Sequence, residues 1–198
     1  MIQVKLIKLK GGDGMSTQSS SVFAGSMLTD AINHNSVTPI NLSGKVGYSV
    51  TLIYKQRHDQ ARIQIESVPA FLAALPNQNQ FFAIELAHRF VGVTTPVIDG
   101  DRIMKEPLAM AVKTMPELSQ ALAAIQDSLD ELTIPKEDLK PNDFDDPKKL
   151  VAECFDAVLY LLNLIAYVCR GFDLSMQDQL KQRMKKWFKD GVVKHRKE

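Results

Sequence analysis

The strongest hydrophobic pattern in the chain runs from Pro147 to Arg170, where apolar residues occupy nearly every side of a helical projection. Asp146 directly before Pro147 is typical of an N-cap followed by a proline in the first helical position. The pattern therefore predicts a long central helix that is buried on most of its surface. Four polar residues interrupt it at spacings that place them on one face: Glu153, Asp156, Tyr160 and Asn163.

This polar face has two interpretations. A carboxylate in a buried helix costs free energy unless a partner compensates its charge. Glu153 and Asp156 lie one turn apart, and a divalent cation that also binds a phosphate chain would compensate both. In the other interpretation the helix is amphipathic and the two carboxylates lie in solvent. The pattern alone does not decide between them.

The first third of the chain has a different period. Residues 2–9 alternate loosely between apolar and polar, and the Gly- and Ser-rich residues 11–21 predict a loop. Residues 45–56 alternate more clearly, with five apolar residues on one side: Val46, Tyr48, Val50, Leu52 and Tyr54. A turn and a second alternating run at residues 61–68 complete a predicted hairpin. We therefore expect a small β-rich N-terminal unit over residues 1–66.

Helical spacing replaces alternation from Ser67 onward. Residues 80–91 carry apolar positions at the helical period and end at Gly92, a common stop residue. A final helix is expected after Ser175, with a capping box at its start. The predicted fold class is therefore α+β, with the β-rich unit followed by a helical domain over residues 67–198.

Between these helices the pattern predicts two further segments. Residues 108–112 suit a short helix, and residues 113–132 carry an apolar stripe at the helical period. Thr114 and Glu117 flank Pro116 in the arrangement of a capping box with proline at a helix start. In this interpretation Glu117 caps its own helix.

Composition limits the functional classes. The chain has 198 residues, 45% of them hydrophobic and 24% charged, which is typical of a soluble globular protein. A formal net charge of +1 argues against a dominant electrostatic partner. Cys154 and Cys169 lie too far apart on one predicted helix to bond, which favours thiols in a reducing compartment. The longest uncharged run, residues 157–169, is shorter than the ~20 residues of a membrane span, so we expect a cytoplasmic protein without a membrane partner.

The sequence ECFDAVLYLLNL at residues 153–164 resembles the second motif of the MazG-type all-α nucleotide pyrophosphohydrolases, a superfamily that includes the dimeric dUTPases. That motif is Glu-x-x-Asp with an Asn seven residues after the Asp, matched by Glu153, Asp156 and Asn163. Residues 171–191 resemble the short turn and basic last helix of the same family. The resemblance implies that the helical domain is a MazG-like bundle that forms homo-oligomers through its helices.

The resemblance also implies a site. Glu153 and Asp156 would be catalytic acids and ligands of Mg²⁺, or of Mn²⁺, which orients the triphosphate and activates the attacking water. Asn163 and Tyr160 would contact the substrate. Lys185 and Lys186 of the last helix would hold its phosphates. A solvated basic face is the alternative interpretation of that helix, and nucleic-acid binding is the least favoured one.

The first motif of the family, Glu-Glu-x-x-Glu, is mostly lost. Its best alignment is PELSQ at residues 116–120, in which Glu117 alone keeps a carboxylate. Gln120 offers a carbonyl oxygen to the metal but no charge. Glu117 and Gln120 are therefore the remaining candidate ligands from this segment.

Two functions follow from these observations. The first is a Mg-dependent nucleoside triphosphate pyrophosphohydrolase that converts a nucleotide (NTP or dNTP) to the monophosphate and pyrophosphate. The second is a non-catalytic helical binding or structural assembly protein, such as a phage component, favoured by the degenerate first motif and the β-rich N-terminus. Both predict a homo-oligomer, since one chain has too few helices to bury residues 157–169.

Overall fold

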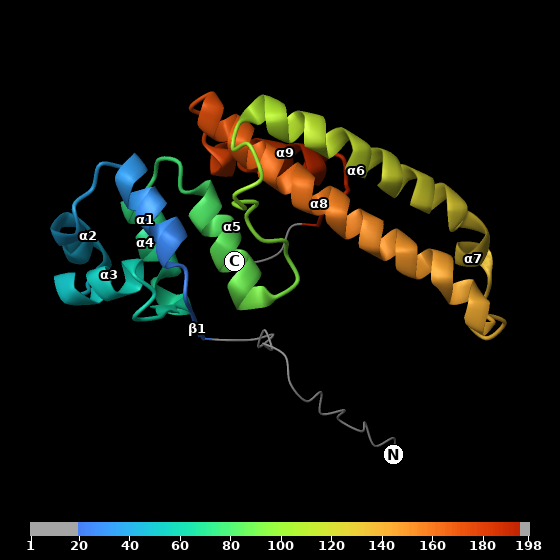
Figure 1. The fold of residues 1–198 in the computed structure, drawn as a ribbon, viewed down its shortest axis with the longest axis horizontal. Helices are drawn as coiled ribbons and strands as arrows, with labels where there is room; N and C mark the ends of the chain where they lie inside the picture. Colours follow the sequence, from blue (N-terminus) through green and yellow to red (C-terminus); the bar gives the residue numbers. More distant parts are fainter. Residues whose placement is uncertain (1–19, 195–198) are drawn as a thin grey trace, which may run out of the picture.

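The computed structural model describes residues 20–194 of the chain. Within them the fold is mostly helical, with one two-stranded antiparallel sheet near the N-terminus. The elements in order are β1 (Ser21–Val22), α1 (Gly25–His34), α2 (Pro39–Val46), α3 (Val50–Arg57), β2 (Ile63–Gln64), η1 (Ile65–Ser67), α4 (Val68–Ala74), α5 (Gln80–Val91), α6 (Pro107–Asp127), α7 (Leu129–Thr133), η2 (Pro141–Phe144), α8 (Asp145–Gly171) and α9 (Met176–Lys189). Helices α1 to α5 gather at one end, and α6 and α8 extend from them as a long hairpin (Figure 1).

The predicted strand at residues 45–56 is wrong, because this segment contains the end of α2, a turn and α3. Local helix signals decide the outcome. The Thr38 hydroxyl accepts a hydrogen bond from the Asn41 amide at 3.2 Å, directly before Pro39 at the first helical position. The Ser49 hydroxyl caps α3 in the same way, and Gly47 ends α2 in the left-handed region at φ 74°. These caps outweigh an alternation that also fits two short helices.

The fold is mostly helical with a small sheet near the N-terminus, as coarsely expected, but residues 20–66 are not β-rich, because three helices lie between two strands of two residues each. The register of the sheet pairs Ser21 with Gln64 and Val22 with Ile63. The second predicted strand is therefore present in shortened form, but it pairs with β1 instead of residues 45–56. The expectations for residues 2–9 and for most of the loop at 11–21 lie outside the described residues.

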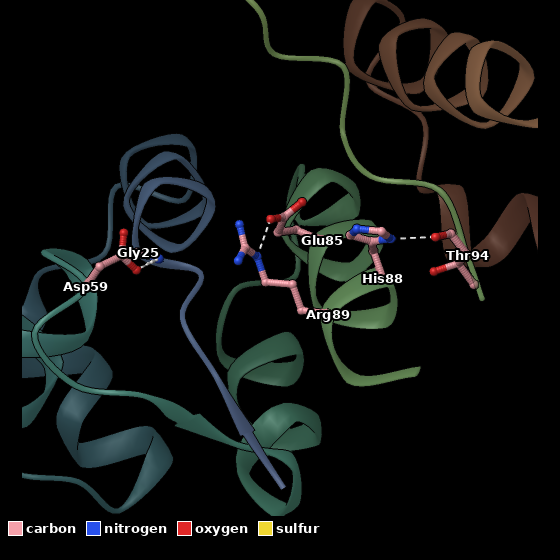
Figure 2. A network of polar contacts seen from close by, with 6 residues as sticks. All are labelled: Gly25, Asp59, Glu85, His88, Arg89 and Thr94. Atoms are coloured by element: carbon pink, nitrogen blue, oxygen red, sulfur yellow. Dashed lines mark hydrogen bonds and ion pairs between the residues drawn. The ribbon is translucent and has the colours of Figure 1, made fainter. Parts of the chain in front are cut away.

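The start of α1 is held against the end of α3. The Gly25 amide donates a hydrogen bond of 2.7 Å to the Asp59 carboxylate (Figure 2). The backbone of Asp59 lies in the left-handed region at φ 53°. A Cβ at position 25 would lie 2.7 Å from the carbonyl oxygens of both Arg57 and Gln56. Only glycine allows this close approach of two backbones.

We expect Gly25→Ala to lower the free energy of unfolding by about 2 kcal/mol, because the added methyl group forces the backbone of α3 away. Gly44→Ala is the matched control. No heavy atom lies within 4 Å of a Cβ there, and the position is inside α2. Alanine at 44 should stabilise the chain by about 0.5 to 1 kcal/mol through helix propensity. Urea unfolding followed by circular dichroism measures both changes; equal midpoints for the two variants would contradict the close approach.

The long C-terminal helix is confirmed, since α8 spans Asp145–Gly171. It packs antiparallel against α6 along most of its length, and Pro107 at the start of α6 meets Gly171 at the end of α8. However, α8 is not buried nearly all round. One side of it packs on α6, another on the N-terminal helices, and a row of apolar side chains on a third side is exposed.

The two helices predicted at 108–112 and 113–132 are one continuous helix, α6, with Pro116 inside it. The predicted capping box is therefore wrong. Thr114 is buried and its hydroxyl donates to the Met110 carbonyl at 2.8 Å, as a residue inside a helix does. A proline inside a helix costs about 3 kcal/mol, which the packing of α6 along α8 offsets.

Candidate functional site

Helix α8 orients the two candidate catalytic acids differently. Glu153 is half-buried and lies in the row of α8 residues that faces α6, whereas Asp156 is exposed. Neither carboxylate has an ion-pair or hydrogen-bond partner among the described residues. Of the two acids that were predicted to face inward, only Glu153 does so. Asp156 faces solvent, which stabilises its charge.

The antiparallel register of the hairpin determines where the first-motif candidates lie. Gly171 contacts Pro107 at one end, and Lys149 forms a 3.7 Å ion pair with Asp127 near the other. This register places Glu117 opposite residues 159–161. Glu153 lies about seven residues further along α8, or ~10 Å at 1.5 Å of rise per residue. Glu117, which is half-buried, is therefore too far along the hairpin to share a metal ion with Glu153.

The predicted Mg²⁺ or Mn²⁺ stays a prediction, and of the three candidate carboxylate ligands the structure places only Glu153 and Asp156 one turn apart. Gln120 is exposed on α6, and Glu117 lies in the α6–α8 contact well away from Glu153. Among residues 20–194, no three His, Cys, Asp or Glu side chains come together as a metal site. Glu153 and Asp156 would supply two carboxylates, and Mg²⁺ commonly fills its remaining positions with waters and substrate phosphates.

Asn163 has a structural role instead of the predicted substrate contact. Its side chain is fully buried, and its carboxamide oxygen accepts a 2.8 Å hydrogen bond from the Ile98 amide. Its Nδ2 group donates to the carbonyls of Pro96 and Leu159 at 3.0 and 2.9 Å. Both donors of the amide are used, so none is left for a substrate. Asn163 fastens the segment before α6 to the middle of α8.

The remaining predicted substrate residues are dispersed. Tyr160 is half-buried and packs against the hydrophobic core. Lys185 and Lys186 are exposed on α9. Within the described part of the chain neither lysine forms an ion pair, so the basic face of α9 remains available to an anion.

Helix α5 makes two polar contacts through its side chains. Glu85 is buried and forms an ion pair with Arg89 one turn away, while the His88 ring donates to the Thr94 carbonyl (Figure 2). The contact between His88 and Thr94 holds the start of the loop between α5 and α6. The Asn163 side chain binds the same loop further along, at Pro96 and Ile98. These side chains hold the loop between α5 and α6 in place and do not converge on Glu153.

The largest unexplained feature is an exposed apolar surface on the hairpin. On each helix the exposed apolar row lies about one position, a rotation of ~100°, after the residues that contact the other helix. Because α6 and α8 run antiparallel, this equal offset places both rows on the same side of the hairpin. We call this surface the apolar face; its residues are Met115, Leu118, Leu122, Ile125 and Leu129 of α6 and Val151, Phe155, Val158, Leu161 and Ile165 of α8.

Every residue of the apolar face is at least 36% exposed, and Met115 reaches 68%. Ten large apolar residues on one side of two helices form a patch of the kind that monomeric soluble proteins seldom expose. The sequence pattern located α8 and its apolar character, but it missed the face, because the face depends on which side of each helix packs on the other.

Among the described residues, one helix, Pro141–Gly171, is long and apolar enough to cross a membrane by length and composition. The core helix of a soluble protein meets the same criteria. The expected cytoplasmic location and the absence of a membrane partner remain predictions.

No protein-family model, curated protein or solved structure matches this chain. The resemblance to the MazG-type pyrophosphohydrolases therefore rests on the Glu153, Asp156 and Asn163 spacing and on the basic last helix.

Proposed function

We propose that this chain is a helical binding and assembly protein, whose α6–α8 hairpin associates through its apolar face with the same face of a second copy. The observation that carries the proposal is the row of ten exposed apolar side chains on one side of the hairpin. Their exposure to water costs about 25 cal/mol for each Å² that a partner would cover. Two hairpins packed face to face form a four-helix arrangement, which is a common way to bury such surfaces.

Charge supports a second copy as the occupant. The net charge of the chain is only +1, so two copies repel each other weakly at long range. The apolar face also carries no charged residue among its ten members, so pairing it with itself buries no unpaired ion. A self-complementary patch of this kind is what a two-fold symmetric dimer requires.

The concentration dependence of thermal unfolding tests this proposal. A chain stabilised by association unfolds at a temperature that rises with protein concentration. We expect the midpoint to rise by several degrees between about 1 and 100 µM. Co-sedimentation with phosphatidylcholine vesicles is measured in parallel. A midpoint independent of concentration, or vesicle binding in place of self-association, would overturn the proposal.

A second candidate is a Mg-dependent nucleoside triphosphate pyrophosphohydrolase. The observation that favours it is the pair of acids on α8, one turn apart and without protein partners, on the same chain as the exposed Lys185 and Lys186. In this function the chain's carboxylates and lysines would bind and orient the triphosphate, and a magnesium ion would supply charge neutralisation. The mismatch between Glu117 and Glu153 argues against a complete metal site in one chain.

Pyrophosphate release distinguishes the two candidates. The common NTPs and dNTPs are incubated with the chain and Mg²⁺ or Mn²⁺. If the chain is an enzyme, release from at least one nucleotide falls more than about 100-fold in Glu153→Gln and Asp156→Asn, while Asp173→Asn, an exposed acid outside the pair, retains activity. No release from any nucleotide supports the assembly function alone. Release that persists in both acid variants contradicts catalysis by this pair.

A further inference from the structure

A small polar pocket lies where the N-terminal helices meet the end of α8, away from the apolar face. Its volume is about 50 Å³, and it is lined by residues from α1, α5, α8 and the segment between α5 and α6. Apolar side chains form part of its wall: Met27, Ala31, Phe81, Phe82 and Val97. Charged groups of both signs complete it, and neither of the functions proposed above uses them: Asp30 and Asp99 are acidic, Lys105 and Arg170 are basic, and the His34 ring lies beside them.

The cationic side of the pocket is rigidly held. The guanidinium of Arg170 lies 4.8 Å from the ring centres of both Phe81 and Tyr167. One of its nitrogens donates to the Lys105 carbonyl at 3.0 Å. Within residues 20–194 Arg170 pairs with no carboxylate, so its other N–H groups are available to an anion. The ring contacts fix the orientation of these donors before any ligand arrives.

The anionic side comes from two other segments. Asp30 of α1 and Asp99 of the segment before α6 both line the pocket. In the described part of the chain neither carboxylate takes part in an ion pair. Burial raises the pKa of Tyr167 above its ordinary value; the charge of Arg170 opposes this rise, and those of Asp99 and Asp30 add to it. The charges of Arg170, Asp30 and Asp99 therefore all act on Tyr167, although among the described residues these three side chains form no ion pair with one another.

Gln78 also lines the pocket. Its Oε1 atom is inaccessible to solvent and has no hydrogen-bond partner among residues 20–194, and its backbone lies in the left-handed region at φ 50°. A buried acceptor without a donor is costly, and a non-glycine residue in this region is strained.

Size and charge define the class of ligand. About 50 Å³ holds three or four water-sized groups, enough for the charged head of a small molecule but not for a nucleotide. An inorganic phosphate would place its negative charges beside two carboxylates. A divalent cation would find no cluster of three ligands among the described residues. A molecule with one positive and one negative group satisfies both sides.

We propose that this pocket binds the zwitterionic head of a free α-amino acid. The ammonium group lies toward Asp30 and Asp99, and the carboxylate lies toward Arg170. The wall of apolar residues limits how far the rest of the molecule enters, so small side chains are favoured. The site lies between segments that are distant in sequence, and binding therefore stabilises the junction of the N-terminal helices with α8.

Calorimetry on the full chain with glycine, alanine and serine tests the site. Acetate, methylammonium, inorganic phosphate and MgCl₂ serve as separate controls. We expect at least one amino acid to bind. At equal concentration, neither acetate, which carries only the carboxylate, nor methylammonium, which carries only the ammonium group, should bind. Asp30→Asn and Asp99→Asn should each weaken binding at least about tenfold, because each removes a charged partner. Asp101→Asn, an exposed acid on the same segment, should leave it unchanged.

A second readout separates binding from folding. Circular dichroism of each variant must match that of the wild-type chain, and the unfolding temperature must rise with the amino acid in the wild type but not in Asp99→Asn. The proposal would be overturned if no amino acid gave binding heat at concentrations up to about 10 mM. Stronger binding of phosphate or magnesium, or equal binding by both aspartate variants and the wild type, would also overturn it.

Discussion

Asn163→Leu is expected to lower the free energy of unfolding by about 3 kcal/mol. Leucine fills a similar volume but leaves the Ile98 amide and the Pro96 carbonyl without their buried partner, and each such group costs about 1–3 kcal/mol. The carbonyl of Leu159 loses only a second donor, because it also accepts a hydrogen bond within α8. Urea unfolding measures the change, and hydrogen exchange should show faster exchange of the Ile98 amide.

Asn142→Leu is the matched control, because Asn142 is an exposed asparagine in η2. Its effect should stay within about 0.5 kcal/mol, as for most surface substitutions. Similar losses in the two variants, or an unchanged Ile98 amide in Asn163→Leu, would show that Asn163 does not fasten the segment to α8.

The double substitution Leu118→Glu/Val151→Glu is expected to dissociate the assembly. Both residues are exposed in the single chain, at 42% and 55%, so the fold of the subunit should persist. In a face-to-face pair the new carboxylates would be buried without partners, which costs several kcal/mol for each ion. We expect the dissociation constant to rise by more than about 1,000-fold, measured by sedimentation velocity.

The control is Ala123→Glu/Ala152→Glu. These alanines are exposed on the same two helices, but each precedes a residue of the α6–α8 contact and so lies on the opposite side of the hairpin. The control adds the same charge without touching the apolar face. If both double variants dissociate equally, net charge and not the face controls assembly; if neither does, the copies associate through another surface.

The long helices could be predicted because their signals are local. Asp146 and Pro147 marked the start of α8 to within two residues, and Gly92 ends α5 in the left-handed region at φ 72°, as its position predicted. Residues 45–56 were mispredicted because alternation over so short a length fits a strand and two short helices alike. The caps at Thr38 and Ser49 carried the deciding information.

The candidate site was less predictable, since it depends on how distant segments meet. Glu153 does face the neighbouring helix, but the register of the hairpin, which no local pattern encodes, separates it from Glu117. Asn163 matches a motif position and is used for packing. The pocket formed by Asp30, Asp99 and Arg170 has no sequence signal at all, because its charges come from three separate segments.

The central claim is that a second copy covers the apolar face of the hairpin. Light scattering of the full chain after size exclusion, at about 50 µM, tests it most directly. The chain has a mass of 22.1 kDa. The account predicts a molar mass at least twice that value for the wild type and a single-chain mass for Leu118→Glu/Val151→Glu. A wild-type mass equal to that of one chain would contradict it.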